Sequence, residues 1–188
     1  YGMTAITALT AQNTKGVQDI HGIPATFLKA QIQSVMDDIG VDAVKIGMLH
    51  APEIVEVVTW AIDTYQLKNV VLDPVMVATS GDRLIASETV EVLVRELFPR
   101  ACLVTPNLDE AVLLLGRELP DASVLESAAR ELLEMGVVLG AATVHTGGAG
   151  GAGGGPRLLR RHLRPAPFFD RQEAKHDGPG VHGRHHAD

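Results

Sequence analysis

Two patterns of apolar and polar residues alternate between residue 1 and residue 146. Short continuous apolar runs are typical of buried strands, and apolar residues at every third or fourth position are typical of helices. Ser87 is the expected cap of its helix, and Gly40 is the expected stop of the first helix. Strands are expected at residues 3–11, 41–47, 69–73, 101–105 and 140–145. Helices are expected at residues 24–39, 52–65, 87–97 and 108–115, and from Asp121 or Ser123 to Met135.

Strands that alternate with helices in this way predict an α/β fold with a mainly parallel sheet. Right-handed crossovers that cover both faces of the sheet would give three layers. Ligands of such sheets bind beyond the carboxyl ends of the strands. The candidate functional residues are therefore those that directly follow a predicted strand, namely Gln12, Asn13, Gly47, Met48, Asp73, Pro74 and residues 105–107.

The charge distribution divides the chain into two segments. Residues 1–146 hold 9 Lys or Arg and 19 Asp or Glu, a balance of −10, whereas residues 147–188 hold 7 and 4, a balance of +3. The second segment also holds 10 of the 19 glycines and 5 of the 8 histidines. We expect residues 1–146 to form part of one domain, and residues 147–188 to be a disordered tail rich in Gly, Arg and His.

The composition excludes several classes of protein. A single cysteine, Cys102, excludes a disulfide scaffold. No apolar run approaches the roughly 20 residues that span a bilayer, and no secretory leader opens the chain. The net charge of −7 argues against nucleic acid as the main partner. We therefore expect a cytoplasmic protein without a membrane or nucleic-acid partner.

Two groups of polar residues at strand ends each have two interpretations. Asp73 can be a turn or helix-cap carboxylate, or it can support Mg²⁺ through water. Asn107 and Glu110 can form a capping box for the helix that follows, or their oxygens can hold hydrated Mg²⁺ near a triphosphate. The spacing alone leaves both alternatives open for each group.

Further candidates are individually weak. Gln12 can bond the edge of a heteroaromatic ring, although a loop hydrogen bond is the commoner role. Met48 can pack on a flat ring beside Gly47, or it can be a core residue after a turn. Residues 148–153 match the dinucleotide pattern G-x-G-x-x-G, but no amphipathic helix follows them. The histidines at 176, 182, 185 and 186 have no expected fold to fix them as a metal site.

Four segments, in this order, resemble one family. They are YGMTAITALTAQNT at residues 1–14, DAVKIGML at 42–49, VLDPVMV at 71–77 followed by SGD, and TPNL at 105–108 followed by EA at 110–111. Together they resemble the hydroxymethylpyrimidine/phosphomethylpyrimidine kinases, a branch of the ribokinase-like fold related to pyridoxal kinases. The resemblance covers residues 1–146.

The resemblance implies ATP-dependent phosphorylation of hydroxymethylpyrimidine and of its monophosphate in thiamine biosynthesis, with ATP and Mg²⁺ as cofactors. It also suggests a homodimer. Gln12 would bond the pyrimidine edge, and the ring pocket would be lined by Thr10, Met48 and Val75. Mg²⁺ and phosphate would be organised by Asp73, Asn107 and Glu110.

The sequence also departs from the family pattern. The family carries a glycine-rich substrate-binding segment before the position of Tyr1, and a late motif N-T-H-G-T-G-C-T. The backbone N–H groups of that motif form an anion hole, and its cysteine is the base. Neither segment stands in this sequence. We therefore expect a fold truncated at the N-terminus and lacking the native C-terminal part, and we assign no catalytic base.

The tail suggests a reading-frame error. Read one nucleotide later, the degenerate codons of residues 175–185 permit NTTGPGCTAAI, which is the missing motif with two changes. The expectation is a frameshift within the Gly/Ala run at residues 147–155, and the alternative is a genuine lineage-specific tail. Two functional alternatives stay open, a catalytically inactive fragment of such a kinase and a pyridoxal or pyridoxamine kinase.

Overall fold

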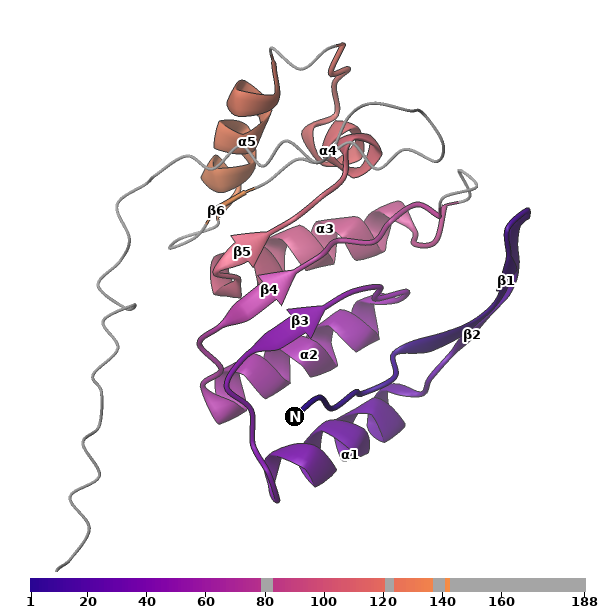
Figure 1. Ribbon diagram of the computed structural model, residues 1–188, viewed down its shortest axis with the longest axis vertical. Helices are drawn as coiled ribbons and strands as arrows, with labels where there is room; N and C mark the ends of the chain where they lie inside the picture. Colours follow the sequence, from indigo (N-terminus) through magenta and orange to yellow (C-terminus); the bar gives the residue numbers. More distant parts are fainter. Residues whose placement is uncertain (79–82, 121–123, 137–140, 143–188) are drawn as a thin grey trace, which may run out of the picture.

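The computed structural model describes residues 1–78, 83–120, 124–136 and 141–142 (Figure 1). The expected disordered tail, with its glycine run and histidines, and the expected helix start at Asp121 or Ser123 lie outside these residues. The strands are β1 (Ala8–Asn13), β2 (Gly16–Gly22), β3 (Val44–Ile46), β4 (Val70–Leu72), β5 (Leu103–Val104) and β6 (Ala141–Ala142). The helices are α1 (Ala25–Met36), α2 (Pro52–Tyr65), α3 (Ser87–Leu97), α4 (Leu108–Leu115), α5 (Leu125–Glu134) and a 3-10 turn at Phe98–Arg100.

Strands β3, β4, β5 and β6 form a four-stranded parallel sheet in that order. They are shorter than the sequence predicted but lie within the expected segments. Because each strand adds to the same side of the one before it, right-handed crossovers place the connecting helices on one face of the sheet. Figure 1 shows α2 and α3 behind the sheet and α1 beside α2. The described residues thus supply the parallel sheet and a helical layer on one of its faces.

The alternation of side chains along the strands decides where the core lies. Ile46, Leu72 and Val104 face the helices and are buried in one cluster with residues of α1, α2, α3 and α5. Lys45 and Val71 are register partners in β3 and β4 and lie on the opposite face. Lys45 is exposed and Val71 is half-buried. Charged side chains of the sheet are therefore found on the face away from these helices and at the strand ends.

Three helices have the bounds predicted from the sequence, namely α2, α3 and α4. Pro52 opens α2, where a missing N–H costs nothing. The prediction that Ser87 caps α3 is wrong, because Ala86 is the N-cap residue and makes no side-chain cap bond. Helix α1 ends at Met36, before the expected Ile39, and Gly40 follows it with a left-handed φ of 71°.

The prediction of one buried strand over residues 3–11 is wrong. β1 begins at Ala8 and pairs antiparallel with β2 in a two-stranded sheet separate from the larger one. The Oδ1 atom of Asn13 accepts the Lys15 N–H at 2.8 Å and closes the turn between the two strands. The side-chain amide of Gln31 in α1 accepts the Ile6 N–H at 2.9 Å and donates to the Ile6 C=O at 3.0 Å. Residues 3–7 are thus extended chain tied to a helix.

None of the helices in the described part of the chain is long and apolar enough to cross a membrane.

Candidate functional site

The carboxyl ends of β3, β4 and β5 lie along one edge of the sheet. The Asp73 N–H donates to the Ile46 C=O at 2.8 Å, and the Thr105 N–H donates to the Leu72 C=O at 2.9 Å. Parallel pairing therefore brings the segments just beyond these strands together. The structure places Met48, Asp73 and Asn107 on these segments.

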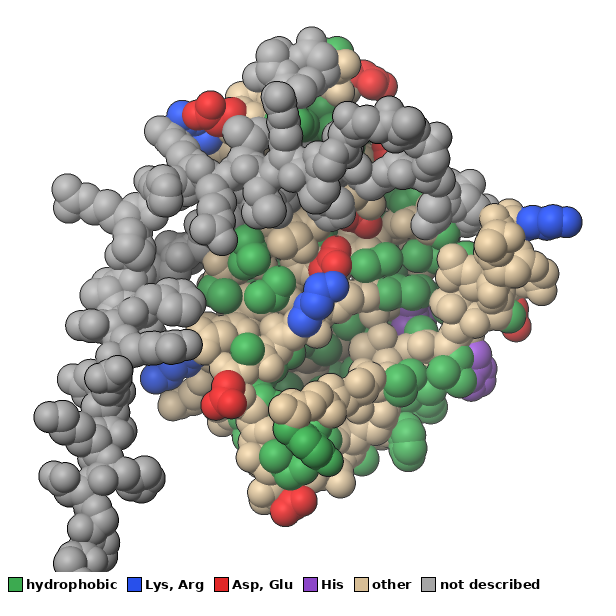
Figure 2. Space-filling view, viewed as in Figure 1, with side chains coloured by type: hydrophobic (Ala, Val, Ile, Leu, Met, Phe, Trp, Pro, Cys, Tyr) green, Lys and Arg blue, Asp and Glu red, His purple; other side chains and the backbone are tan. Residues whose placement is uncertain are grey.

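Asp73 is held by a lysine from the neighbouring strand. The Lys45 Nζ lies 2.6 Å from the Asp73 Oδ2, and the two side chains are 67% and 24% exposed. The Val75 N–H donates to the Asp73 C=O at 2.8 Å, which tightens the chain after β4. Figure 2 shows a basic and an acidic side chain in contact near the middle of this face, over β3 and β4 and among hydrophobic side chains. The Asp73 carboxylate is thus part-buried and already neutralised by a cation.

Asn107 and Glu110 form the capping box that the sequence allowed. The Asn107 Oδ1 accepts the Glu110 N–H at 2.9 Å, and the Glu110 Oε2 accepts the Asn107 N–H at 2.8 Å. Glu110 is only 2% exposed, and its Oε1 accepts the Met76 N–H at 3.3 Å. This carboxylate therefore joins the start of α4 to the loop after β4, which carries Asp73.

The donor atoms at this edge fit Mg²⁺ at Asp73. Mg²⁺ takes hard oxygen ligands and keeps several waters, with one or two carboxylates and substrate phosphates completing its shell. Asp73 offers a part-exposed carboxylate, whereas the oxygens of Glu110 already accept backbone N–H groups. Within the described ranges, no group of three or more His, Cys, Asp or Glu side chains could hold a metal ion by itself. A hydrated ion that shares its shell with phosphate is what this site could accept.

Thr10 and Gln12 lie away from this edge, on the outer part of the β1–β2 hairpin. Both side chains are exposed, and Thr10 pairs with Ile20 while Gln12 pairs with Val17. A register shift between Ala11 and Gln12 marks a bulge, which re-aims the side chains that follow. Figure 1 shows the hairpin projecting beyond the sheet. Among the described residues, neither side chain makes a hydrogen bond to the strand ends.

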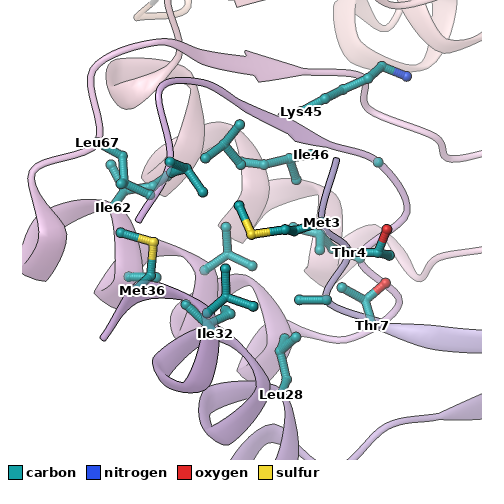
Figure 3. Close-up of a pocket in the computed structure, with 18 of the residues that line it drawn as sticks. Met3, Thr4, Thr7, Leu28, Ile32, Met36, Lys45, Ile46, Ile62 and Leu67 are labelled. Carbon is teal, nitrogen blue, oxygen red and sulfur yellow. The ribbon is translucent and has the colours of Figure 1, made fainter. Parts of the chain in front are cut away.

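Met48 and Val75 are both half-buried beside the edge. Met48 lines a cavity of about 350 Å³, and its C=O accepts a hydrogen bond from the Thr7 hydroxyl at 2.7 Å. Figure 3 shows the walls of this cavity, with Met3, Thr4 and Thr7 on one side and side chains of α1 facing them. Lys45 lies at its rim, and its ammonium points away from the cavity. The lining is largely apolar.

Sequence reasoning missed two contacts that shape this region. The Lys45–Asp73 pair joins residues 28 positions apart, and the Gln31–Ile6 pair joins residues 25 positions apart. The Lys45–Asp73 contact can be predicted only if the register between β3 and β4 is known. The sequence signal for the Lys45–Asp73 pair was the apolar runs around these two residues, which predicted that each lies in or just after a strand.

The family is identified by the match of the whole described region. A family model described as phosphomethylpyrimidine kinase matches residues 1–152. The chain belongs to this family. The match to the family model ends at residue 152, within the Gly/Ala run at residues 147–155 where the change of reading frame is expected.

Relatives of known name share large parts of the sequence with this family member. It is 47% identical over 140 residues to a hydroxymethylpyrimidine/phosphomethylpyrimidine kinase of Escherichia coli, covering 72% of this chain and 52% of that protein. It is 46% identical over 136 residues to the thiamine biosynthesis bifunctional protein ThiED of Geobacter sulfurreducens, covering 72% of this chain and 28% of that protein. The chain thus spans about half or less of these relatives' length.

Solved structures support the same family placement of the chain. A phosphomethylpyrimidine kinase of Clostridium difficile is 36% identical with a TM-score of 0.68, covering 79% of this chain and 65% of that chain. A Bacillus subtilis pyridoxal kinase in an ADP complex is 35% identical with a TM-score of 0.67, covering 79% and 56%. The expected family and the ribokinase-like α/β fold are thereby confirmed.

Proposed function

We propose that the chain derives from, and supplies part of, an ATP-dependent kinase of hydroxymethylpyrimidine and its monophosphate in thiamine biosynthesis. The observation that carries this proposal is the family match over residues 1–152, together with 47% identity to a kinase of that name. With hydroxymethylpyrimidine, the hydroxyl oxygen bonds to the γ-phosphorus of ATP, ADP leaves, and the hydroxyl proton passes to a base. With the monophosphate, an ionised phosphate oxygen makes the same attack and ADP leaves. This catalysis rests mainly on positioning and charge stabilisation.

The residues at the carboxyl edge fit distinct parts of this reaction. Asp73 would hold hydrated Mg²⁺, whose chemical contribution is to neutralise charge on the phosphates of ATP. Asn107 and Glu110 would act on the metal and phosphates chiefly by fixing the loop between β4 and α3, since Glu110 bonds the Met76 N–H. Each of these side chains would position charge rather than take part in bond making.

The substrate ring would occupy the space between the edge and the hairpin. Met48 and Val75 are half-buried beside that space and offer apolar surface, while Thr10 and Gln12 sit on the exposed hairpin. Gln12 can bond the pyrimidine edge only if the hairpin lies over Asp73 with ligand bound.

A pyridoxal or pyridoxamine kinase is the second candidate. The likeness to a Bacillus subtilis pyridoxal kinase, at a TM-score of 0.67, favours it. The third candidate is an inactive fragment, because the sequence of residues 147–188 contains no segment like N-T-H-G-T-G-C-T. A cytoplasmic location and a homodimer complete the proposal.

A phosphate-transfer assay distinguishes the candidates. ADP release would be measured with hydroxymethylpyrimidine, its monophosphate and pyridoxal, for this chain and for a version restored to the other reading frame after residue 147. We expect the restored version to act on both pyrimidine compounds and the present chain to lose at least about 10²-fold in rate, because anion-hole donors are absent. Measurable activity of the present chain equal to that of the restored version would refute the inactive-fragment candidate, and turnover of pyridoxal alone would refute the pyrimidine proposal.

A matched pair of variants tests the role of Asp73. Asp73→Asn in the restored version should lower the rate about 10²-fold, because the metal loses its carboxylate. Asp109→Asn removes an exposed carboxylate in the first turn of α4 and should leave the rate unchanged. Equal rates for both variants would contradict the assignment of Asp73.

A further inference from the structure

Lys45 and Asp73 project from neighbouring strands onto the same face of the sheet. Lys45 is the register partner of Val71, and residues 71 and 73 share a face because side chains alternate along a strand. The helices of the described region pack on the opposite face, where Ile46 and Leu72 are buried. The pair therefore stands at the ligand-binding edge of the sheet, on the face away from the described helices.

The lysine is held in place yet available. Its side chain is 67% exposed, and the bond to the Asp73 Oδ2 at 2.6 Å fixes the position of the ammonium. An ammonium has three donors, and among the described residues the Lys45 Nζ makes one hydrogen bond. Exposed ion pairs contribute little to folding stability, so stability alone gives a weak reason for a lysine here.

The positive charge of Lys45 beside Asp73 makes this part of the sheet edge suitable for an anionic ligand. A lone Asp73 carboxylate would repel a phosphate that approaches the strand ends. Lys45 balances this charge, and its ammonium points away from the cavity (Figure 3). Charge-assisted hydrogen bonds to phosphate are among the stronger polar contacts in proteins. The Asp73–Lys45 pair can thus bind metal through the carboxylate and phosphate through the ammonium.

We infer that Lys45 binds a phosphate group of the ligand beside Asp73. The ligand class is a phosphate ester, either the polyphosphate of a nucleotide or the monophosphate of the pyrimidine compound. Asp73 positions the ammonium before the ligand arrives. This inference rests on the proposed function, because it takes the ligands of that function as the source of the phosphate.

Binding measurements on the full 188-residue chain test the inference. Calorimetry would give dissociation constants for MgATP, for hydroxymethylpyrimidine monophosphate and for uncharged hydroxymethylpyrimidine. Lys45→Met keeps an apolar stem but removes the charge, and Lys45→Arg restores a cation. The matched control is Lys68→Met, an exposed lysine in the loop before β4, at the opposite end of the sheet.

We expect Lys45→Met to weaken one phosphorylated ligand about tenfold or more, through loss of a charge-assisted contact. The affected ligand identifies the source of the phosphate. Lys45→Arg should recover most of the affinity, and Lys68→Met should behave as the unmodified chain. Binding of the uncharged pyrimidine should not change in any variant, which a general disturbance of the fold would not allow.

Four results would overturn the inference. Lys45→Met could bind both phosphorylated ligands as tightly as the unmodified chain, or it could lose the uncharged pyrimidine equally. The unmodified chain could also bind the uncharged pyrimidine but neither phosphorylated ligand, which contradicts the inference and leaves the proposed ring site standing. A chain that binds none of the three ligands overturns the inference for this chain and favours the inactive-fragment candidate, which the assay on the restored version tests separately.

Discussion

Leu72 in β4 and Leu9 in β1 are both leucines in strands, yet Leu72 is fully buried and Leu9 is 53% exposed. The strand of Leu72 lies within a parallel sheet packed on helices, whereas the strand of Leu9 has a single antiparallel partner. The body, meaning the four-stranded sheet with its helices, is stabilised by burial. The hairpin, meaning β1 and β2, is held by its own ladder and a few anchoring contacts. Of the residues that the sequence predicts for the site, Asp73, Asn107 and Glu110 stand on the body, whereas Thr10 and Gln12 stand on the hairpin.

The largest expected effect comes from removing a buried leucine of the body. Leu72→Ala should lower the free energy of unfolding by about 2–5 kcal/mol, because it leaves a cavity in the core. Leu9→Ala should lower it by less than about 0.5 kcal/mol, because the side chain is already in water. Urea denaturation of both variants measures the difference. Equal losses would show that the hairpin is as firmly packed as the body.

The next effect concerns the buried carboxylate that joins α4 to the loop after β4. Glu110→Ala removes the acceptor of the Met76 and Asn107 N–H groups. It should cost about 1–3 kcal/mol, because buried donors lose their partner. Asp109→Ala, an exposed change in the same helical turn, should cost much less in the same denaturation experiment. A cost for Asp109→Ala as large as that for Glu110→Ala would contradict the role of the capping box.

A smaller effect tests where the hairpin meets the body. A Cβ atom at Gly22 would lie 2.2 Å from the His50 Nε2, so Gly22→Ala should cost about 1–2 kcal/mol, at the low end for overpacking because the ring can turn. The rate of hydrogen exchange of the β2 amides should be higher in Gly22→Ala than in the unmodified chain. Adding His50→Ala should recover β2 protection, and Gly2→Ala, with nothing within 4 Å, is the neutral control. Failure of the double variant to recover would place the clash elsewhere.

The smallest effect is a pH dependence within the body. Arg100 donates to both carboxylate oxygens of Asp63 at 2.8 Å. This hydrogen bonding, partly opposed by desolvation and helped by the charge of Arg100, lowers the pKa of Asp63 below its ordinary 3.8. A lowered folded-state pKa adds stability above the unfolded value, and that stability is lost as the pH falls through the folded one.

Asp63→Asn should therefore cost roughly 0.2–1 kcal/mol at neutral pH, the range of exposed ion pairs. The cost should vanish once the pH lies below the lowered pKa of Asp63. Glu56→Gln, an exposed change on the same helix, is the control at each pH. A cost that persists in acid would assign the effect to packing instead of charge.

The helices of the body could be predicted from the sequence because their signals are local. Apolar spacing and Pro52 fix α2, and the spacing of Asn107 and Glu110 fixes the start of α4. Because Asn107 and Glu110 are only three residues apart, the sequence also allowed the capping box to be recognised as one of two interpretations. The sequence left open whether these oxygens cap the helix or hold a metal. The structure shows that they accept backbone N–H groups of Asn107, Glu110 and Met76.

The hairpin could not be predicted because the apolar residues of β1 do not mark buried positions. β1 is exposed along most of its length, so its small apolar residues imitate a buried strand without being one. The Lys45–Asp73 contact likewise depends on the register between β3 and β4, which no local pattern encodes. Long-range pairing decided both features.

The amide of Gln31 that holds Ile6 gives the first residues of the chain an unusual mode of attachment. Both polar backbone groups of Ile6 depend on a single side chain, so one rotamer change of Gln31 would release both together. The Ile6 amide should accordingly show protection in solvent exchange although it belongs to no strand, and Gln31→Ala should abolish that protection in one step. The first turn of α1 would keep its own protection, so the release would spread toward Tyr1 and leave the helix intact.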